Sequence, residues 1–358
     1  MERKYYIDNL RWLAILLLFP FHALQIWNGG EYSGFYIWAH TDTVMYALST
    51  AIYPWFMTLL FTIAGMSTRY ALQRRTPKQF IAERSKKLMI PFIFGILILA
   101  PAMTYVAEIF FNGYTGSYFY QYYLFFTKET DLTGYKGGFT PGHLWFLLYL
   151  FIISLITIII IQLQKKYLPK LKITNVGYGV LVLLFIPQWF MLYVLNIGGK
   201  SVGQFLTLFL LGYYIVSEEK VLQTIKRYRF ASLALWMITG CIYTYLYCFV
   251  NLRNEIGTGL FVFFGWIGIL ALLGIGQTAL NCHNRICDYF ARASFPIYII
   301  HQTVLVIVGY FVLKVSASVW VQFLLVVLFS FLGTIMIYEI VKRIPYLRVL
   351  IGVSRQQF

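Results

Sequence analysis

Residues 142–164 read GHLWFLLYLFIISLITIIIIQLQ, an apolar stretch that contains no Asp, Glu, Lys or Arg. An α-helix needs about 20 predominantly apolar residues to cross the hydrocarbon core of a bilayer, so this stretch predicts a transmembrane helix. The rest of the chain is similar, because 60% of its 358 residues are hydrophobic and only 12% are charged. A soluble globular domain carries about 25% charged residues. The composition therefore excludes a water-soluble enzyme, a disordered chain and a disulfide scaffold.

Further apolar stretches of spanning length occur on both sides of this one. We expect an all-α, polytopic integral membrane protein with about ten transmembrane helices. The expected helices lie at residues 10–29, 44–68, 89–111, 142–164, 174–195, 202–218, 230–250, 257–279, 294–313 and 318–341. Residues 1–341 would form a single transmembrane domain, and residues 342–358 a basic cytoplasmic tail lying on anionic lipid.

The basic residues fall mainly on one side of these crossings. The net charge is +16, and only five of the 29 Lys and Arg residues lie in the expected outer segments. These five are Lys128, Lys136, Lys200, Arg253 and Lys314. Because cytoplasmic loops collect Lys and Arg, the asymmetry predicts both termini in the cytoplasm and explains the charge without a nucleic-acid partner. We expect the cell membrane as the location.

The cysteines do not predict a metal site, and the amino terminus does not predict a cleaved signal peptide. The four Cys residues match no zinc-binding spacing, so we expect no metal. The opening MERKYYIDNLRW places charges before an apolar run that no small-residue cleavage site follows. This pattern predicts an uncleaved first helix.

The longest expected outer loop, residues 112–141, is rich in aromatic residues and glycine. It reads NGYTGSYFYQYYLFFTKETDLTGYKGGFTP. Tyr and Trp are enriched at membrane interfaces, which makes an interfacial belt one interpretation. The alternative is a rim around an acceptor site, where Tyr rings stack on sugar faces and their hydroxyls form hydrogen bonds.

Arg11 and His22 are the most informative polar residues of the first helix. Ionisable side chains within membrane spans are costly and usually face a protein interior or a water-filled cavity. Eleven helical steps bring His22 to within roughly 20° of the azimuth of Arg11 and about 16 Å deeper. Asp8 is placed to pair with Arg11 at i, i+3, and Pro20 is expected to disturb the helix beside His22. We expect one groove lined by Arg11 at the cytoplasmic mouth and His22 near mid-membrane.

An imidazole in this position can act as the base that acyl transfer to an alcohol requires. Arg84 and Lys87, in the basic segment before the third helix, are three residues apart and expected on one face. Two cations there suit an anionic cofactor with several phosphates, because Arg offers a bidentate fork and Lys a point charge. Plain positive-inside topology is the alternative interpretation of this segment.

Four stretches in order along the chain resemble motifs of the acyltransferase-3 family of multi-pass membrane O-acyltransferases. They are IDNLRWLAILLLFPFH, ERSKKLMIPF, PGHLWFLLYL and SFPIYIIHQ. The resemblance implies a ten-helix core, acetyl coenzyme A or another acyl-CoA as donor, and a carbohydrate or other hydroxylated acceptor. It implies His22 as the catalytic histidine with Arg11 as its motif partner, and Arg84 with Lys87 as the cations that hold the coenzyme. Lys87 departs from the family pattern, which has a second Arg there.

The remaining candidates for substrate binding are His143, Trp145, His301 and Glu108. His143 and Trp145 stand at the outer entrance of the fourth helix, where they cap that entrance or touch an acceptor. His301 lies about 10 Å into the ninth helix, where packing and a place in the cavity wall are equally open. Glu108, near the outer end of the third helix, is placed to hydrogen-bond sugar hydroxyls.

Together these residues predict a membrane acyltransferase that moves an acyl group, acetyl first, from acyl-CoA to a hydroxyl of an envelope carbohydrate. His22 would deprotonate the acceptor or, in the alternative, carry the acyl group itself. The rival class is a secondary transporter or glycan exporter, but such proteins commonly have two related halves, and the sequence has no such repeat. A scaffold without catalysis is the third possibility.

Overall fold

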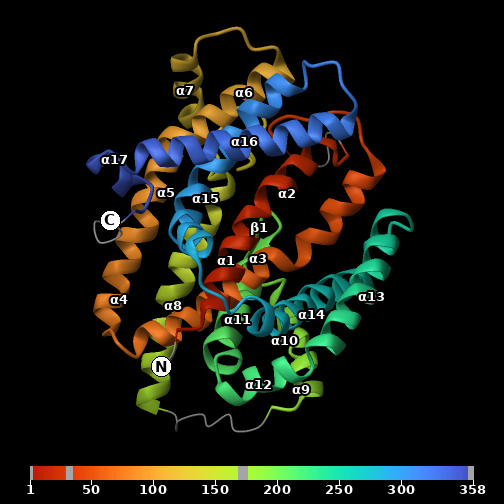
Figure 1. Ribbon diagram of the computed structural model, residues 1–358. Helices are drawn as coiled ribbons and strands as arrows, with labels where there is room; N and C mark the ends of the chain where they lie inside the picture. Colours follow the sequence, from red (N-terminus) through yellow and green to blue (C-terminus); the bar gives the residue numbers. More distant parts are fainter. Residues whose placement is uncertain (1–2, 30–34, 168–175, 354–358) are drawn as a thin grey trace. The chain divides into compact units, whose positions relative to one another are not determined.

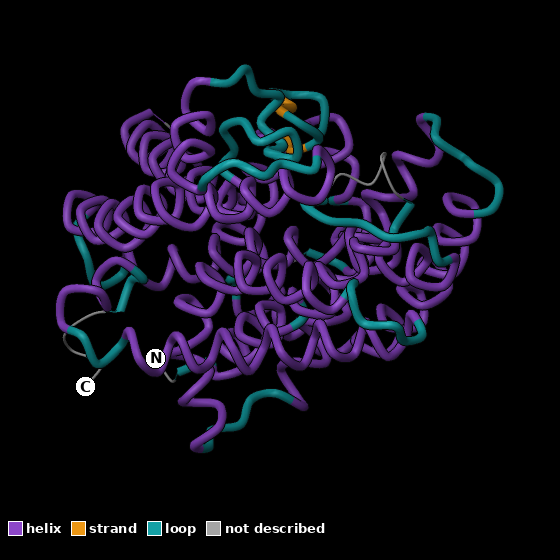
Figure 2. The backbone as a smooth tube through the Cα atoms, turned by 90° about the horizontal axis from the view of Figure 1, so that it is seen from above, coloured by secondary structure: helices purple, strands orange, loops and turns teal. Residues whose placement is uncertain are grey.

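The computed structural model describes residues 3–29, 35–167 and 176–353, and these are almost entirely helical (Figures 1 and 2). The helices up to residue 167 are α1 (Tyr5–Leu16), α2 (Leu18–Leu24), η1 (Gln25–Trp27), α3 (Thr43–Leu72), α4 (Pro77–Arg84), η3 (Ser85–Met89), α5 (Ile90–Phe94), η4 (Gly95–Leu99), α6 (Ala100–Asn112), α7 (Tyr118–Thr127), η5 (Gly142–Leu144) and α8 (Trp145–Tyr167). Those that follow are α9 (Tyr178–Leu183), α10 (Phe185–Met191), α11 (Val202–Leu211), η6 (Gly212–Val216), α12 (Glu219–Arg227), α13 (Arg229–Cys248), α14 (Glu255–Ala279), α15 (Arg285–Val312), α16 (Val319–Val341) and α17 (Pro345–Leu350).

Two short strands complete the described secondary structure. β1 (Asn196–Ile197) and β2 (Lys200–Ser201) pair antiparallel, with Ile197 opposite Lys200 (Figure 2). Gly198 and Gly199 join them with φ values of 57° and 76°. A two-residue hairpin turn of this kind requires left-handed backbone at both positions, which glycine adopts without strain.

Within residues 3–29, 35–167 and 176–353, eight helical stretches are long and apolar enough to cross a membrane. They are Tyr5–Trp27, Thr43–Leu72, Pro77–Asn112, Gly142–Tyr167, Arg229–Cys248, Glu255–Ala279, Arg285–Val312 and Val319–Val341. Two shorter apolar stretches, Tyr178–Met191 and Val202–Val216, stand where the fifth and sixth crossings are expected. The all-α polytopic membrane fold is confirmed. Residues 174 and 175 of the expected fifth helix and residues 354–358 of the expected tail lie outside the described residues.

The chain divides into two compact units, each drawn from three separate stretches. Unit 1 comprises Met1–Ala14, Thr50–Arg84 and Tyr149–Ala291, and unit 2 comprises Ile15–Ser49, Ser85–Leu148 and Arg292–Phe358. The predicted division into a transmembrane domain at 1–341 and a tail at 342–358 stays a prediction.

Unit 1 is built around α14, which runs beside α13 and also contacts α12 and α10 (Figure 1). Glycines allow these helices to approach closely. A Cβ on Gly265 would lie 2.6 Å from the backbone oxygen of Pro54, and one on Gly268 would lie 2.6 Å from Trp236 Nε1. Small residues at such contacts are the usual means of close helix packing in membranes. The glycine-rich composition of this helix is therefore explained by packing.

Unit 2 buries α2 and packs it against α16. Five of the seven residues of α2 are buried: Leu18, Phe19, Phe21, Ala23 and Leu24. Most of α2 therefore lies in the core of this unit, while Pro20 and His22 are partly exposed.

The third crossing begins earlier than expected, at Pro77 instead of residue 89, and contains two π-helical turns. The turns η3 and η4 end two residues before Pro91 and Pro101, respectively. Proline lacks the amide hydrogen and clashes with the carbonyl four residues before it, and a wider turn relieves that clash. The prolines that indicate a helix end in a soluble protein are accommodated within a continuous apolar helix here.

The segment 112–141 contains a helix, α7, that its glycine-rich composition does not predict. Ser117 begins α7 as its N-cap, and its Oγ accepts a hydrogen bond from Tyr120 N at 3.2 Å. Gln121 Nε2 donates to the backbone oxygen of Gly137 at 2.9 Å and fixes the helix to the remainder of the segment. Phe119, with 83% of its surface exposed, lies on the outward side of α7.

Candidate functional site

α2 carries His22 and begins after a one-residue interruption of the first helix at Leu17. Pro20 has no amide hydrogen to donate, which removes one backbone bond of the helix. Phe21 N still donates to Leu17 O at 3.0 Å, so the chain resumes a helical path at once. The helix is disturbed close to where Pro20 is expected to disturb it. The groove shared by Arg11 and His22 stays a prediction.

Unit 2 brings three imidazole rings together in its core. The ring centroids of His22 and His301 are 5.3 Å apart, and those of His143 and His301 are 5.0 Å apart. The three residues come from α2, η5 and α15, which are far apart in sequence. Two of the substrate-binding candidates thus lie in the same cluster as the predicted catalytic histidine.

Hydrogen bonds fix two of these rings. His143 Nε2 lies 2.9 Å from the backbone oxygen of Ile299, and His301 Nδ1 lies 2.6 Å from that of Tyr298. A carbonyl oxygen only accepts, so each of these ring nitrogens carries the hydrogen and donates. In the neutral ring the other nitrogen then carries a lone pair. Tyr298 Oη also donates to the backbone oxygen of His143, which ties η5 to α15 a second time.

The lone-pair nitrogens of these two rings are buried without a partner. His143 Nδ1 and His301 Nε2 form no hydrogen bond within the described structure. His301 has no exposed surface and His143 is 6% exposed, whereas the residue His22 is partly exposed. A buried acceptor left unpaired costs about 1–3 kcal/mol, and a catalytic role is one explanation for such an atom.

His22 is held by aromatic rings. It stacks on Phe35 at 6.0 Å with a 15° angle between the planes, and Phe21 meets it edge-on at 5.2 Å. Within the described residues, no group of three or more His, Cys, Asp or Glu side chains is arranged to hold a metal ion. The chemistry that this cluster supports is proton transfer by imidazole.

Unit 1 brings Arg11 and Arg84 to neighbouring positions on α3. Arg11 Nη2 donates to Ser67 Oγ at 2.8 Å, and Arg84 Nη2 donates to Thr68 Oγ1 at 3.1 Å. Arg11 Nη1 also pairs with Asp8 Oδ1 at 2.9 Å, the i, i+3 pair expected from the sequence. Two of the three cations predicted to hold a donor are therefore anchored on consecutive residues of one helix.

Lys87 lies in the π-helical turn η3, and its Nζ sits 5.5 Å from the ring centroid of Phe295 within unit 2. Because Arg84 belongs to unit 1 and Lys87 to unit 2, the shared face expected for these two cations stays a prediction.

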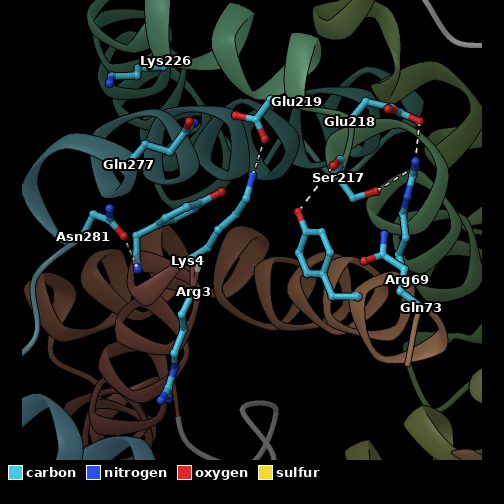
Figure 3. A pocket seen from close by; sticks show the side chains of 12 residues that line it. Arg3, Lys4, Arg69, Gln73, Ser217, Glu218, Glu219, Lys226, Gln277 and Asn281 are labelled. Atoms are coloured by element: carbon cyan, nitrogen blue, oxygen red, sulfur yellow. Dashed lines mark hydrogen bonds and ion pairs between the residues drawn. The ribbon is translucent and has the colours of Figure 1, made fainter. Parts of the chain in front are cut away.

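A cavity of about 520 Å³ opens in unit 1, and its lining includes Arg69 and Tyr70 of α3, directly after Ser67 and Thr68 (Figure 3). Its lining includes four basic residues, two carboxylates and three amides: Arg3, Lys4, Arg69, Lys226, Glu218, Glu219, Gln73, Gln277 and Asn281. Figure 3 shows Lys4 directed at Glu219 and Arg69 directed at Glu218. Lys4 Nζ lies 2.7 Å from Glu219 Oε2, and Arg69 Nη2 lies 2.6 Å from Glu218 Oε1. Tyr6 also lines the cavity and is 4% exposed, and its buried hydroxyl has no hydrogen-bond partner in the part of the chain that the structure describes.

The cavity is linked to Arg11 through a shared carboxylate. Asp8 Oδ2 accepts from Arg3 Nη2 at 3.0 Å, while its other oxygen holds Arg11. The hydrogen bond to Asp8 raises the pKa of the Arg3 guanidinium above its usual value, so Arg3 remains charged throughout the physiological range.

From the sequence, the cavity residues Arg3, Lys4 and Arg69 indicate only membrane topology. The polar run Ser67, Thr68, Arg69 at the end of an apolar helix is the signal that could have located this region.

Glu108 and Trp145 lie elsewhere in unit 2. Glu108 is 5% exposed, and its Oε1 accepts from Lys128 Nζ at 2.8 Å. A Cβ on Gly137 would lie 2.4 Å from the same oxygen. The carboxylate therefore joins α6 to the segment 112–141. Trp145 begins α8 and meets Phe146 edge-on at 6.3 Å.

The fold and the two groups of residues define a class of protein: a multi-pass helical membrane protein with a buried imidazole cluster and a cationic region anchored on α3. The family profile described as an acyltransferase domain, that of the acyltransferase-3 family, matches residues 4–339. The chain belongs to this family and is an O-acyltransferase. The transporter and scaffold alternatives are thereby set aside.

Curated relatives match over nearly the whole chain at low identity. "Glucans biosynthesis protein C" of Salmonella heidelberg (strain SL476) is 24% identical over 375 residues, covering 97% of this chain and 94% of the relative. The protein of the same name from Salmonella typhi is 24% identical over 374 residues, with the same coverage. That of Escherichia coli O1:K1 / APEC is 22% identical over 386 residues, covering 98% and 94%. No solved structure matches the chain.

Proposed function

We propose that this protein transfers an acyl group, acetyl in the first instance, from acyl-coenzyme A to a hydroxyl of a glucan or a similar envelope carbohydrate. The family match supports acyl transfer, and the name of the relatives supports a glucan as the acceptor. The observation that carries the mechanism is the imidazole cluster, in which His22 alone of the three rings keeps more than marginal exposure.

His22 acts as the general base. It takes the proton of the acceptor hydroxyl as the oxygen attacks the thioester carbonyl, and the carbon–oxygen bond forms while the carbon–sulfur bond breaks. The proton then passes from His22 to the leaving thiolate. Well-positioned acid–base catalysis of this kind contributes about 10²–10⁴-fold to the rate.

Arg11 and Arg84 hold the phosphates of the donor. Charge-assisted hydrogen bonds from guanidinium to phosphate are short and strong, and both side chains are anchored by hydroxyls on α3. Lys87 adds a further cation from the same sequence motif. The cavity in unit 1 receives the nucleotide end of the donor, because its volume suits a small ligand and its amides and the Tyr6 hydroxyl suit a base.

The donor arrives from the cytosol, and the protein resides in the cytoplasmic membrane with both termini inside. The support is the asymmetry of the Lys and Arg residues between the two sides of the expected crossings.

The test uses purified protein with radiolabelled acetyl coenzyme A and a glucan acceptor. We expect His22→Ala to lose transfer by at least about 10²-fold while donor binding is retained. We expect Arg84→Ala to raise the donor KM by about 10–100-fold, since a hydrogen bond to a charged group contributes about 1.5–3 kcal/mol.

The matched control is Arg74→Ala, which removes an exposed cation from the same basic segment without touching the site. Its donor KM should equal that of the wild type. Unaltered turnover in His22→Ala would refute the proposed base, and equal donor KM values in Arg84→Ala and Arg74→Ala would refute the proposed donor site.

A further inference from the structure

The His301 ring is the centre of the imidazole cluster, although the mechanism above does not use it. It has no exposed surface and contacts His22, His143 and Phe19, the last edge-on at 5.6 Å. A fully enclosed ring does not bind the acceptor directly. Its role must be exerted through its neighbours.

The orientation of His301 is fixed from its own helix. Nδ1 donates to Tyr298 O, three residues earlier in α15, and so points back along that helix. Nε2 is on the opposite side of the ring, away from the backbone of α15. It therefore presents its lone pair to the residues packed against this helix, which include His22 and His143.

The His22 and His301 rings pack against each other at a tilt, close to the separation that a hydrogen bond between them needs. Each imidazole nitrogen lies about 1.1 Å from its ring centroid and an N–H···N bond spans about 3 Å, so bonded rings have centroids about 5 Å apart. The observed separation is 5.3 Å. Among the described residues, His301 Nε2 has no hydrogen-bond partner, and the His22 ring stacks on Phe35. The bonded pair would form by a rotation of the His22 side chain. Catalytic hydrogen bonds are often loose in the absence of substrate.

We propose that His301 is the positioning residue of His22: its Nε2 accepts the N–H of His22 and thereby turns the second nitrogen of His22 toward the acceptor hydroxyl. The inference rests on the proposed role of His22. In hydrolases with a Ser-His-Asp triad, a buried carboxylate performs this task. Here a tautomer-locked imidazole does so, and among the described residues the histidine paired with a carboxylate is His283, with Asp288, outside the cluster.

The proton balance closes within this arrangement. One nitrogen of His22 keeps its hydrogen and donates it to His301 Nε2 throughout. The other nitrogen takes the acceptor proton and returns it to the leaving thiolate, so His301 gains and loses no proton. His143 fixes the far side of the cluster, because its two hydrogen bonds hold η5 against α15.

Two substitutions of His301 separate positioning from packing. His301→Asn keeps an amide donor near the Nδ1 position and leaves the Nε2 position empty. His301→Gln reaches the Nε2 position with a carbonyl oxygen that accepts. We expect His301→Asn to lower kcat by about 10²-fold with the KM values for donor and acceptor within about twofold of wild type. His301→Gln should retain kcat to within about tenfold, and the exposed His40→Gln serves as the matched control.

A second measurement does not depend on turnover, and its wild-type result alone can contradict the proposal. The protein has five histidines, so ¹⁵N-histidine NMR of the wild type in lipid nanodiscs can be assigned by comparison with His22→Gln. We expect one fixed His22 tautomer when coenzyme and acceptor are bound, and a mixture of both tautomers in His301→Asn.

A mixture in the wild type, or equal kcat values for the Asn and Gln variants, would overturn the positioning role. Full activity of His22→Ala would instead refute the proposed base. The two failures are therefore distinguishable, because the NMR result reports on the His22–His301 pair alone.

Discussion

Single polar atoms without partners are the most informative features at the residue scale. A buried hydroxyl or ring nitrogen that forms no hydrogen bond lowers stability, so folding alone gives no reason for its presence. The described structure has such atoms in both units: the Tyr6 hydroxyl at the cavity of unit 1, and His143 Nδ1 and His301 Nε2 in unit 2. In the proposals above, the Tyr6 hydroxyl bonds the donor and His301 Nε2 accepts from His22.

Tyr6→Phe tests the cavity as the nucleotide site. The substitution removes an unpartnered hydroxyl, so the melting temperature should stay the same or rise. If the hydroxyl bonds the donor, the donor KM should increase by about 2–12-fold, the equivalent of 0.5–1.5 kcal/mol. The measurement is acetyl transfer at varied donor concentration, beside thermal unfolding of the same sample. Tyr228→Phe, at a stacked pair away from the cavity, is the control, and an unchanged KM in Tyr6→Phe would remove the cavity from the donor site.

At the scale of elements, composition was sufficient to predict the long spanning helices. It was insufficient to predict the short helix α7 and the π-helical turns. The eight spanning stretches follow directly from apolar length. The helix α7 depends on the Ser117 cap and on the bond from Gln121 to Gly137, contacts that a glycine-rich stretch does not reveal. The π-helical turns depend on how prolines are accommodated inside an apolar helix.

In the candidate site, too, local contacts could be predicted from the sequence and long-range contacts could not. The i, i+3 pair of Asp8 and Arg11 is local, and helical spacing predicts it. The cluster of His22, His143 and His301 joins elements separated by more than a hundred residues, and periodicity within one helix carries no information about such contacts. The cavity of unit 1 was missed for the same reason.

The packing of α14 supports a stability prediction at this scale. Gly265→Ala places a methyl group 2.6 Å from Pro54 O, and relieving that overlap should destabilise the protein by about 1–3 kcal/mol. Gly179→Ala in α9 is the control, because its Cβ meets no atom within 4 Å and alanine favours helix. Thermal unfolding of both variants in detergent gives the comparison. A Gly265→Ala protein that melts with or above Gly179→Ala would contradict the close approach of α14 and α3.

At the scale of the whole molecule, the distribution of basic residues predicts which loops face the cytosol. In a variant whose four native cysteines are replaced, Glu129→Cys should react with a membrane-impermeant maleimide in intact cells. Lys78→Cys should react only after permeabilisation. Both side chains are exposed, so accessibility within the protein does not limit either reaction. Labelling of Lys78→Cys in intact cells would reverse the topology and remove the cytosolic route for the donor.

Unit 1 is built from separate stretches of the chain, so α1 at its start packs against residues at the end of α14 and just after it. Asn9 Nδ2 donates to the backbone oxygens of Leu280 and Cys282, at 2.7 and 2.9 Å, and Leu10 packs on Gly276. The ribosome therefore releases α1 into the bilayer long before its binding partners have been translated. During that interval lipid or an insertase must contact the Asn9 side chain of α1. A premature stop codon before residue 276 would leave that side chain permanently without these hydrogen-bond partners.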